Sequence, residues 1–236
     1  MTVQELSEEI FKRYGAITRA KNCFLYTKKS IRLTDMFQEN GRCILGWQCD
    51  SAFTQFKNTL NRGQVGSFIC EQSSVSRVEK AISKLFDSQR KVFIFSNKHD
   101  ALKASLIFSN SNSSVYLPWS PQETVWKDID SIVFTPPLPW TDTVFFVAVK
   151  TELLIDNPDL EKIIPSTIQI PYALQNAITR SIYNLIKALN ERQEKDWFIY
   201  DQILTKYWIR KGPYLFPKIP QDEYNSFIKH CLDCEI

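Results

Sequence analysis

The stretch KVFIFSNKHDALKASLIF, Lys91–Phe108, decides the fold class of this chain. Its first part, Lys91–Phe95, predicts a buried strand, and Asp100–Phe108 then has the residue spacing of a helix. Further strands are predicted at Val115–Leu117, Ser131–Thr135 and Thr143–Val149. Strands that alternate with helices are typical of α/β layers, so we expect a mainly parallel central sheet covered by helices.

The composition is that of an ordinary folded protein. Of the 236 residues, 44% are hydrophobic and 23% are charged, and the formal net charge is only +3. The longest apolar run, Val144–Val149, is far shorter than the roughly 18 residues of a membrane span. Met1–Lys12 contains three glutamates where a signal peptide would be apolar. We therefore expect a cytoplasmic protein that binds neither nucleic acid nor a membrane.

The six cysteines are spaced at intervals that match no zinc pattern. Cys231 and Cys234 form a single CxxC pair after His230, and this pair lacks the second pair of ligands that a zinc site needs. A chain with this much apolar material does not depend on a disulfide framework. The sequence therefore predicts reduced thiols and no metal site.

Three parts are expected along the chain. Residues 1–50 begin with a helical pattern over residues 3–14 and continue with short strands. Residues 51–165 contain the α/β pattern. Residues 166–236 begin with a long apolar helix face, Leu174–Leu189, and predict a helix-rich α+β domain. We expect the N-terminal part to pack with this C-terminal domain.

Residues 22–46, NCFLYTKKSIRLTDMFQENGRCILG, resemble the opening segment of fold-type I enzymes, which depend on pyridoxal phosphate (PLP). The most similar branch contains the class-III aminotransferases and the glutamate-1-semialdehyde aminomutase-like proteins. In that family a short hairpin and an Asp lead to a Gly-His turn, and Trp47 stands here at the His position. The later order, with Arg62-Gly63 between two helices and then the strand and helix of Val92–Phe108, is also similar. The resemblance implies a PLP-dependent transferase fold with a large and a small domain.

The resemblance places a phosphate-binding turn at Asn97, Lys98, His99 and Asp100. The family has a Ser-Gly-Ser/Thr-Glu-Ala motif here, whose glycine lets the phosphate approach main-chain N–H groups at a helix start. Asp100-Ala101 matches the acidic-Ala pair, whereas Lys98 stands at the glycine position and His99 at the hydroxyl position. The alternative is a surface turn that Asp100 caps.

PLP chemistry needs a lysine that binds the cofactor covalently and an Asp beside the pyridine nitrogen. Lys150 is the candidate for this lysine, because it ends the apolar strand Val144–Val149. Asp128 and Asp130 are the candidate partners of the nitrogen. The alternative for Lys150 is the solvated end of a strand.

The resemblance extends to the C-terminal third of the chain. Ile170–Ser181 and Arg210–Pro217 resemble the small domain that follows the active site. Members of the family are much longer chains, so the resemblance implies that part of the large domain is missing. The deletion falls between about Val115 and Thr135, where the cofactor ring would lie.

Three functions follow from these patterns. The leading hypothesis is a shortened, degenerate and non-catalytic aminotransferase-like protein that acts as a binding or interaction protein. Because no glycine occurs between Gly66 and Gly212, we expect PLP to bind weakly or not at all. The first alternative is an active PLP-dependent aminotransferase or aminomutase that uses Lys150, with Lys98 on the phosphate. The second is a small-molecule binder with Trp140 and the preceding proline-rich loop in its cleft.

Two kinds of partner are expected. A homodimer follows from the resemblance, since the family builds its sites at a two-fold interface, and symmetric dimers are the commonest assembly. The tryptophans Trp119, Trp126 and Trp140 predict an apolar surface that another protein covers. Aromatic residues at this density are equally typical of core within one chain.

Overall fold

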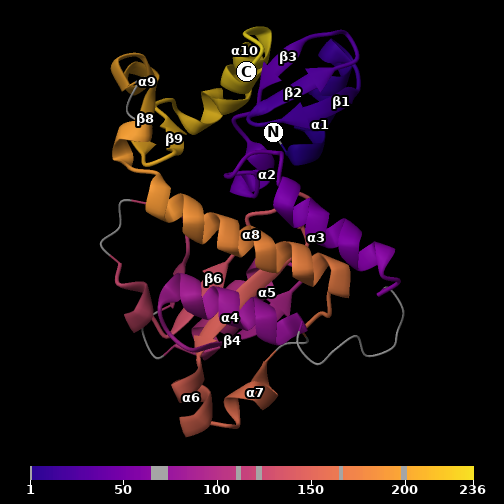
Figure 1. Ribbon diagram of the computed structural model, residues 1–236. Helices are drawn as coiled ribbons and strands as arrows, with labels where there is room; N and C mark the ends of the chain where they lie inside the picture. Colours follow the sequence, from indigo (N-terminus) through magenta and orange to yellow (C-terminus); the bar gives the residue numbers. More distant parts are fainter. Residues whose placement is uncertain (1, 65–73, 110–112, 121–123, 165–166, 198–200) are drawn as a thin grey trace. The chain divides into compact units, whose positions relative to one another are not determined.

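The computed structural model describes residues 2–64, 74–109, 113–120, 124–164, 167–197 and 201–236 (Figure 1). The chain divides into two compact units. Unit 1 combines Met1–Gln48 with Gln193–Ile236, and unit 2 is Cys49–Arg192. The two ends of the chain thus fold together, but the second boundary lies at Arg192 and not near residue 166, because the long helix after Pro171 packs within unit 2.

Unit 2 is built on a four-stranded sheet with the order β4-β7-β6-β5. The strands are β4 (Arg90–Phe95), β5 (Ser113–Val115), β6 (Ser131–Phe134) and β7 (Phe145–Lys150). β5 and β6 are parallel, whereas β7 is antiparallel to both of its neighbours, β4 and β6. The α/β class is confirmed, but the expectation of a mainly parallel sheet is wrong.

The direction of β7 follows from its connection to β6. Residues 135–144 contain three prolines and form turns but no helix. A parallel neighbour would need a crossover of a dozen or more residues, usually with a helix in it. The chain therefore turns back, and Phe134 pairs with Phe146 in an antiparallel register. β4, β5 and β6 still share one direction, so their carboxyl ends lie at the same edge of the sheet.

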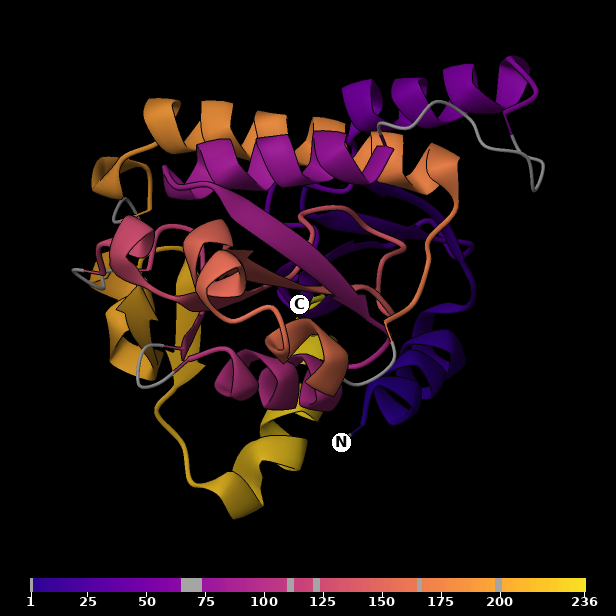
Figure 2. The same ribbon diagram turned by 90° about the horizontal axis from the view of Figure 1, so that it is seen from below.

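Helices cover both faces of this sheet. Their bounds are α3 (Asp50–Asn61), α4 (Ser74–Phe86), α5 (Lys98–Ile107), α6 (Thr151–Asp156), α7 (Leu160–Ile163) and α8 (Tyr172–Glu191). α4 contacts β4 and α8, and α3 packs on α8, whereas α5 contacts β6 and β7. Figure 2 shows α4 and α8 on one side of the strands and α5 on the other.

The residues of β6 and most of those of β4 and β7 are buried, and most of them are apolar, because helices cover both faces of the sheet. Val133 and Val147 face α5, where they form a core cluster with Ala101, Ala104 and Phe108. The alternate side chains face α4, as shown by the rings of Phe134 and Phe86, whose centroids are 6.0 Å apart. Each large apolar side chain buried in this way contributes about 1.5–3 kcal/mol to folding.

Unit 1 takes elements from both ends of the chain. The N-terminal elements are α1 (Val3–Tyr14), β1 (Ile17–Lys21), β2 (Phe24–Thr27), β3 (Arg32–Thr34) and the turn labelled α2 (Gln38–Gly41). The C-terminal elements are α9 (Asp201–Tyr207), β8 (Trp208–Lys211), β9 (Tyr214–Pro217) and α10 (Tyr224–Asp233), together with two short 3-10 turns, Glu194–Asp196 and Gln221–Glu223. β1, β2 and β3 form an antiparallel sheet, and β8 pairs with β9.

Direct contacts join the two ends of the chain. The Tyr14 hydroxyl donates a hydrogen bond to the main-chain oxygen of Leu232, and both residues lie in one buried cluster with Leu33. The Thr34 N–H donates to the main-chain oxygen of Glu235 at 2.8 Å. The C-terminal segment thus covers the open edge of the N-terminal sheet at β3.

Asp35 organises the segment that leaves this sheet. Its buried carboxylate accepts hydrogen bonds from the N–H groups of Phe37 (3.0 Å) and Gln38 (2.8 Å), and from the indole N–H of Trp47 (2.6 Å). Gln38–Gly41 lies in the left-handed region, with φ between +47° and +82°. Each residue other than glycine costs about 1–2 kcal/mol there. The three bonds to one carboxylate offset this cost.

Replacing Asp35 is therefore expected to destabilise the protein strongly. We expect Asp35→Ala to lower the free energy of unfolding by about 2–4 kcal/mol, because three donors lose a charged acceptor. Urea unfolding followed by circular dichroism measures the loss, with Asp156→Ala at an exposed carboxylate as the matched control. A loss for Asp35→Ala no larger than that of the control would contradict this role.

Candidate functional site

The carboxyl ends of β4, β5 and β6 define the sheet edge at which ligands of α/β proteins usually bind. Three segments of unit 2 meet this edge. They are the turn from β4 into α5, the segment that follows β5, and the loop 135–144 between β6 and β7. The predicted phosphate-binding turn, Asn97–Asp100, is the first of these.

The side chain of Asn97 closes the start of α5. Its Oδ1 accepts a hydrogen bond from the N–H of Asp100 at 2.9 Å, and its Nδ2 donates to Asp100 Oδ2 at 2.7 Å. Asn97 is therefore the N-cap, and Asp100 is not the cap that the alternative interpretation assumed. Lys98 and His99, in the first turn, are exposed to solvent.

This arrangement leaves little for a phosphate group. The N–H that would point at the ligand from the third helical position is already bonded to Asn97. The carboxylate of Asp100 also lies at the positive end of the helix dipole, where it takes the place of an external anion. Each position from Asn97 to Ala101 carries a side chain, so this turn lacks the bare backbone of a phosphate cradle.

Lys150 lies at the opposite edge of the sheet. Because β7 is antiparallel to β4, Lys150 pairs with Arg90, the first residue of β4, whereas Asn97 follows its last residue. Six to seven residues of extended strand lie between Arg90 and Asn97, so Lys150, which pairs with Arg90, is about 20 Å from Asn97. The structure therefore does not bring Lys150 together with Asn97–Asp100.

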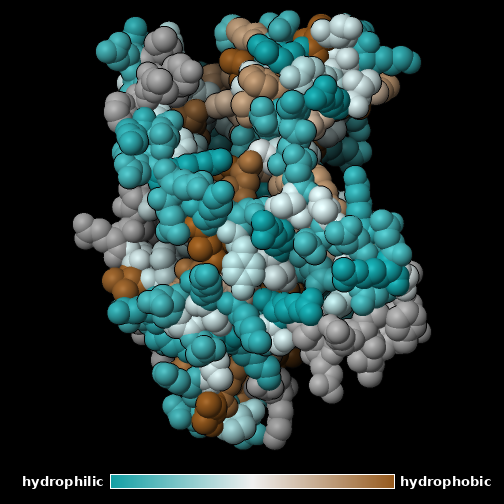
Figure 3. Space-filling view, in the orientation of Figure 1, coloured by the Kyte–Doolittle hydropathy of each residue, from teal (hydrophilic) through white to brown (hydrophobic). Residues whose placement is uncertain are grey.

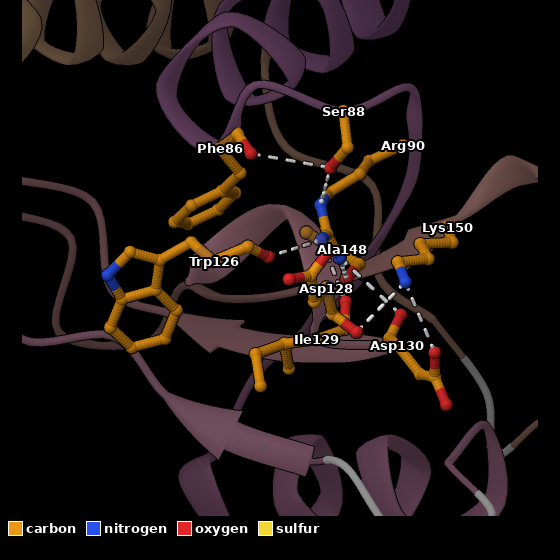
Figure 4. Close-up of polar contacts among 9 residues, drawn as sticks. All are labelled: Phe86, Ser88, Arg90, Trp126, Asp128, Ile129, Asp130, Ala148 and Lys150. Atoms are coloured by element: carbon orange, nitrogen blue, oxygen red, sulfur yellow. Dashed lines mark hydrogen bonds and ion pairs between the residues drawn. The ribbon is translucent and has the colours of Figure 1, made fainter. Parts of the chain in front are cut away.

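The Lys150 ammonium group already has acceptors of its own. Its Nζ donates to the main-chain oxygen of Asp128 at 2.9 Å and pairs with the Asp130 carboxylate at 3.5 Å (Figure 4). These are the two aspartates that the sequence suggested as partners of a cofactor nitrogen. In the structure they instead hold Lys150 at the start of β6.

Arg90 is the main polar residue that the sequence analysis missed. It is only 3% exposed, and its guanidinium donates five hydrogen bonds of 2.8–3.4 Å. The acceptors are Ser88 Oγ and the main-chain oxygens of Trp126, Ile129, Asp130 and Ala148 (Figure 4). Burial lowers the pKa of Arg90 to about 10, so the group remains charged at neutral pH. An arginine at the start of a strand whose last four residues are apolar was the signal in the sequence.

The tryptophans have different surroundings. Trp126 packs within the chain, with its ring 4.9 Å from that of Tyr116, and the guanidinium of Arg192 lies 5.5 Å from the ring of Trp119. Trp140 is 65% exposed. On the face drawn in Figure 3, hydrophilic residues predominate and hydrophobic ones form small separate patches.

The thiols and carboxylates of the described residues form no group that could hold a metal ion. Among the described residues, Cys23, Cys43, Cys49, Cys231 and Cys234 form no disulfide, and Cys70 lies outside the described residues. Burial, with the nearby Asp50 carboxylate, raises the pKa of Cys49 to about 11, so this thiol is protonated at neutral pH. Among the described helices, none is long and apolar enough to cross a membrane.

The chain is similar in sequence to proteins of uncharacterised function. One from Treponema pallidum (strain Nichols) is 23% identical over 271 aligned positions, which cover 97% of this chain and 87% of the relative. One from Borreliella burgdorferi is 26% identical over 113 positions, covering 47% of this chain and 40% of the relative. No family model matches the chain.

Solved structures identify the fold. The taurine:2-oxoglutarate aminotransferase of Bifidobacterium kashiwanohense, solved with PLP and glutamate, has a TM-score of 0.65 at 9% identity and covers 100% of this chain and 90% of that one. The acetylornithine aminotransferase of Elizabethkingia anophelis has a TM-score of 0.64 at 10% identity, covering 97% and 88%. A glutamate-1-semialdehyde aminomutase of Pseudomonas aeruginosa gives 0.55 at 7% identity, covering 84% and 72%. The chain has the fold of the fold-type I PLP-dependent transferases.

The candidate residues Asn97–Asp100 and Lys150, as the structure describes them, nevertheless do not fit PLP. The start of α5 is capped by its own side chain and carries a carboxylate, and Lys150 is engaged at the other edge of the sheet. No catalytic step through PLP can be assigned to these residues.

Arg90 and Lys150, neighbours in the ladder, are expected to differ sharply in their effect on stability. We expect Arg90→Met to lower the free energy of unfolding by about 3–5 kcal/mol, because buried main-chain oxygens lose their donors. The matched variant Lys150→Met should lose about 1 kcal/mol or less, as a partly exposed ion pair at 3.5 Å does. Urea unfolding of both variants tests this difference, and equal losses would contradict a structural role special to Arg90.

Proposed function

We propose that this chain is a degenerate, non-catalytic protein of the PLP-transferase fold that acts as a binding or interaction protein. The observation that carries the proposal is the closed start of α5, where Asn97 and Asp100 bond to each other in two ways. The position of Lys150 at the opposite edge supports it.

The free energies of the contacts at the start of α5 favour the hydrogen bonds between Asn97 and Asp100 over a bound phosphate. A phosphate would have to displace Asn97 from the Asp100 N–H, which costs a hydrogen bond of about 0.5–1.5 kcal/mol. A helix N-terminus returns about 0.3–1 kcal/mol to an anion. Repulsion from the Asp100 carboxylate at about 4 Å costs about 1–4 kcal/mol, depending on exposure to solvent. The exposed Lys98 returns at most about 1 kcal/mol. Over most of these ranges the costs to a phosphate exceed the returns.

A titration with PLP tests the proposal. We expect neither saturable quenching of tryptophan fluorescence at micromolar PLP nor the visible absorbance band of a lysine-bound cofactor. Borohydride treatment followed by peptide mass spectrometry should find no lysine that is modified in preference to the others. Lys187→Ala, which removes a solvent-exposed lysine of α8, is the control for random surface modification.

The alternative enzyme gives a different result. If Lys150 binds the cofactor, the band appears, borohydride fixes the cofactor on Lys150, and Lys150→Ala loses the adduct while Lys187→Ala keeps it. That outcome would overturn the proposed function.

We also infer that the chain forms a homodimer. Symmetric dimers are the commonest assembly of soluble proteins. Light scattering at high protein concentration is expected to give twice the mass of one chain, and a monomer would contradict the inference.

A further inference from the structure

We infer that unit 2 binds a small, neutral aromatic molecule at Trp140, an inference that rests on the proposed function as a binding protein. A cavity of about 230 Å³ opens there. Residues that line it include Phe56, Leu60, Gln64, Trp140, Pro171 and Tyr172, all of which belong to unit 2. We call it the Trp140 cavity.

Two aromatic rings form one wall of the Trp140 cavity. The ring centroids of Phe56 and Trp140 are 5.3 Å apart, and the ring planes meet at 75°. Rings attract one another in such edge-to-face geometry and in offset stacks, at centroid separations of about 4.5–7 Å. A third, flat ring can therefore join this pair with favourable contacts that an aliphatic group of equal size does not make.

Trp140 has a strained main-chain conformation in the loop between β6 and β7. Trp140 has φ +70°, which is rare for a bulky residue, and its side chain is 65% exposed. The residues that flank it are buried, since Leu138 is 1% and Thr141 0% exposed. The Thr141 hydroxyl donates to the main-chain oxygen of Leu138 at 2.6 Å. Strain that the surrounding structure enforces is typical of ligand sites.

The lining determines the chemistry of the ligand. None of the described residues that line the cavity is charged, and the polar side-chain groups are the Gln64 amide, the Tyr172 hydroxyl and the Trp140 indole N–H. A charged ligand would lose its hydration without gaining a counter-ion. An engineered cavity of about 150 Å³ in another protein holds benzene, so this larger one suits one or two rings.

Fluorine NMR of the full chain labelled with 5-fluorotryptophan tests the inference. The probes are indole and benzyl alcohol, with cyclohexanol as the non-aromatic control and benzoate as the charged control. Indole and benzyl alcohol should shift the Trp140 resonance saturably, with a dissociation constant below about 1 mM. The resonances of Trp126 and Trp208, which pack against rings elsewhere, should stay in place.

Variants separate binding from folding. Trp140→Gly should weaken indole binding at least tenfold, observed by saturation-transfer NMR, without lowering the melting temperature, because glycine adopts φ +70° without strain. Leu60→Trp, which fills the cavity, should also weaken binding, whereas Ile155→Ala at an exposed position on α6 should leave it unchanged. A Trp140 that serves only in folding would lower the melting temperature in Trp140→Gly.

Three outcomes would overturn the inference. They are shifts that do not saturate or that are equal at all tryptophans, binding of cyclohexanol or benzoate as tight as that of indole, and unchanged indole binding by the folded Trp140→Gly protein. None of these outcomes changes the result expected for the PLP titration. Conversely, a lysine-bound PLP would overturn the proposed function without deciding whether indole binds.

Discussion

The antiparallel insertion of β7 between β4 and β6 determines where every candidate residue of unit 2 lies. A loop without a helix forces this direction, and the direction places Lys150 beside Arg90 at one edge of the sheet. The same loop presents Trp140 at the other edge, where β4 leads into Asn97. The short connection between β6 and β7 thus keeps Lys150 away from the start of α5. It also places Trp140 at the carboxyl ends of β4 and β6, where ligands of α/β proteins usually bind.

The remaining polar network serves the fold. Arg90 binds the main-chain oxygens of the segment that enters β6 and that of Ala148 in β7, so one guanidinium fixes the relative positions of three strands. In unit 1, Asp35 has a comparable role, since its carboxylate binds both sides of a left-handed turn. In both places a buried charge satisfies main-chain groups that lie outside regular helix and sheet pairing.

The sequence predicted the positions of helices and strands better than the directions in which the strands pair. Apolar periodicity located β4, α5 and α8 within a few residues, because burial on one or both faces leaves a clear pattern. The apolar pattern does not specify the direction of a strand, because β7 would be equally apolar if it ran parallel or antiparallel to β4 and β6. The strand β1 was missed, as most of its residues are exposed. The sequence indicated a junction between a strand and a helix near Asn97–Asp100, but the hydrogen bonds that close this helix start depend on a geometry that residue types do not specify.

The chain has the PLP-transferase fold, Asn97 bonds to Asp100 at the start of α5, and Lys150 bonds to Asp128 and Asp130 at the other edge of the sheet; we propose that these contacts exclude PLP. A crystal structure of the protein grown with excess PLP tests this most directly. We predict that Asn97 still bonds to Asp100, that Lys150 still bonds to Asp128 and Asp130, and that no PLP density appears at either place. PLP density at the start of α5, with the Asn97 side chain displaced and a lysine joined to the cofactor, would contradict the account.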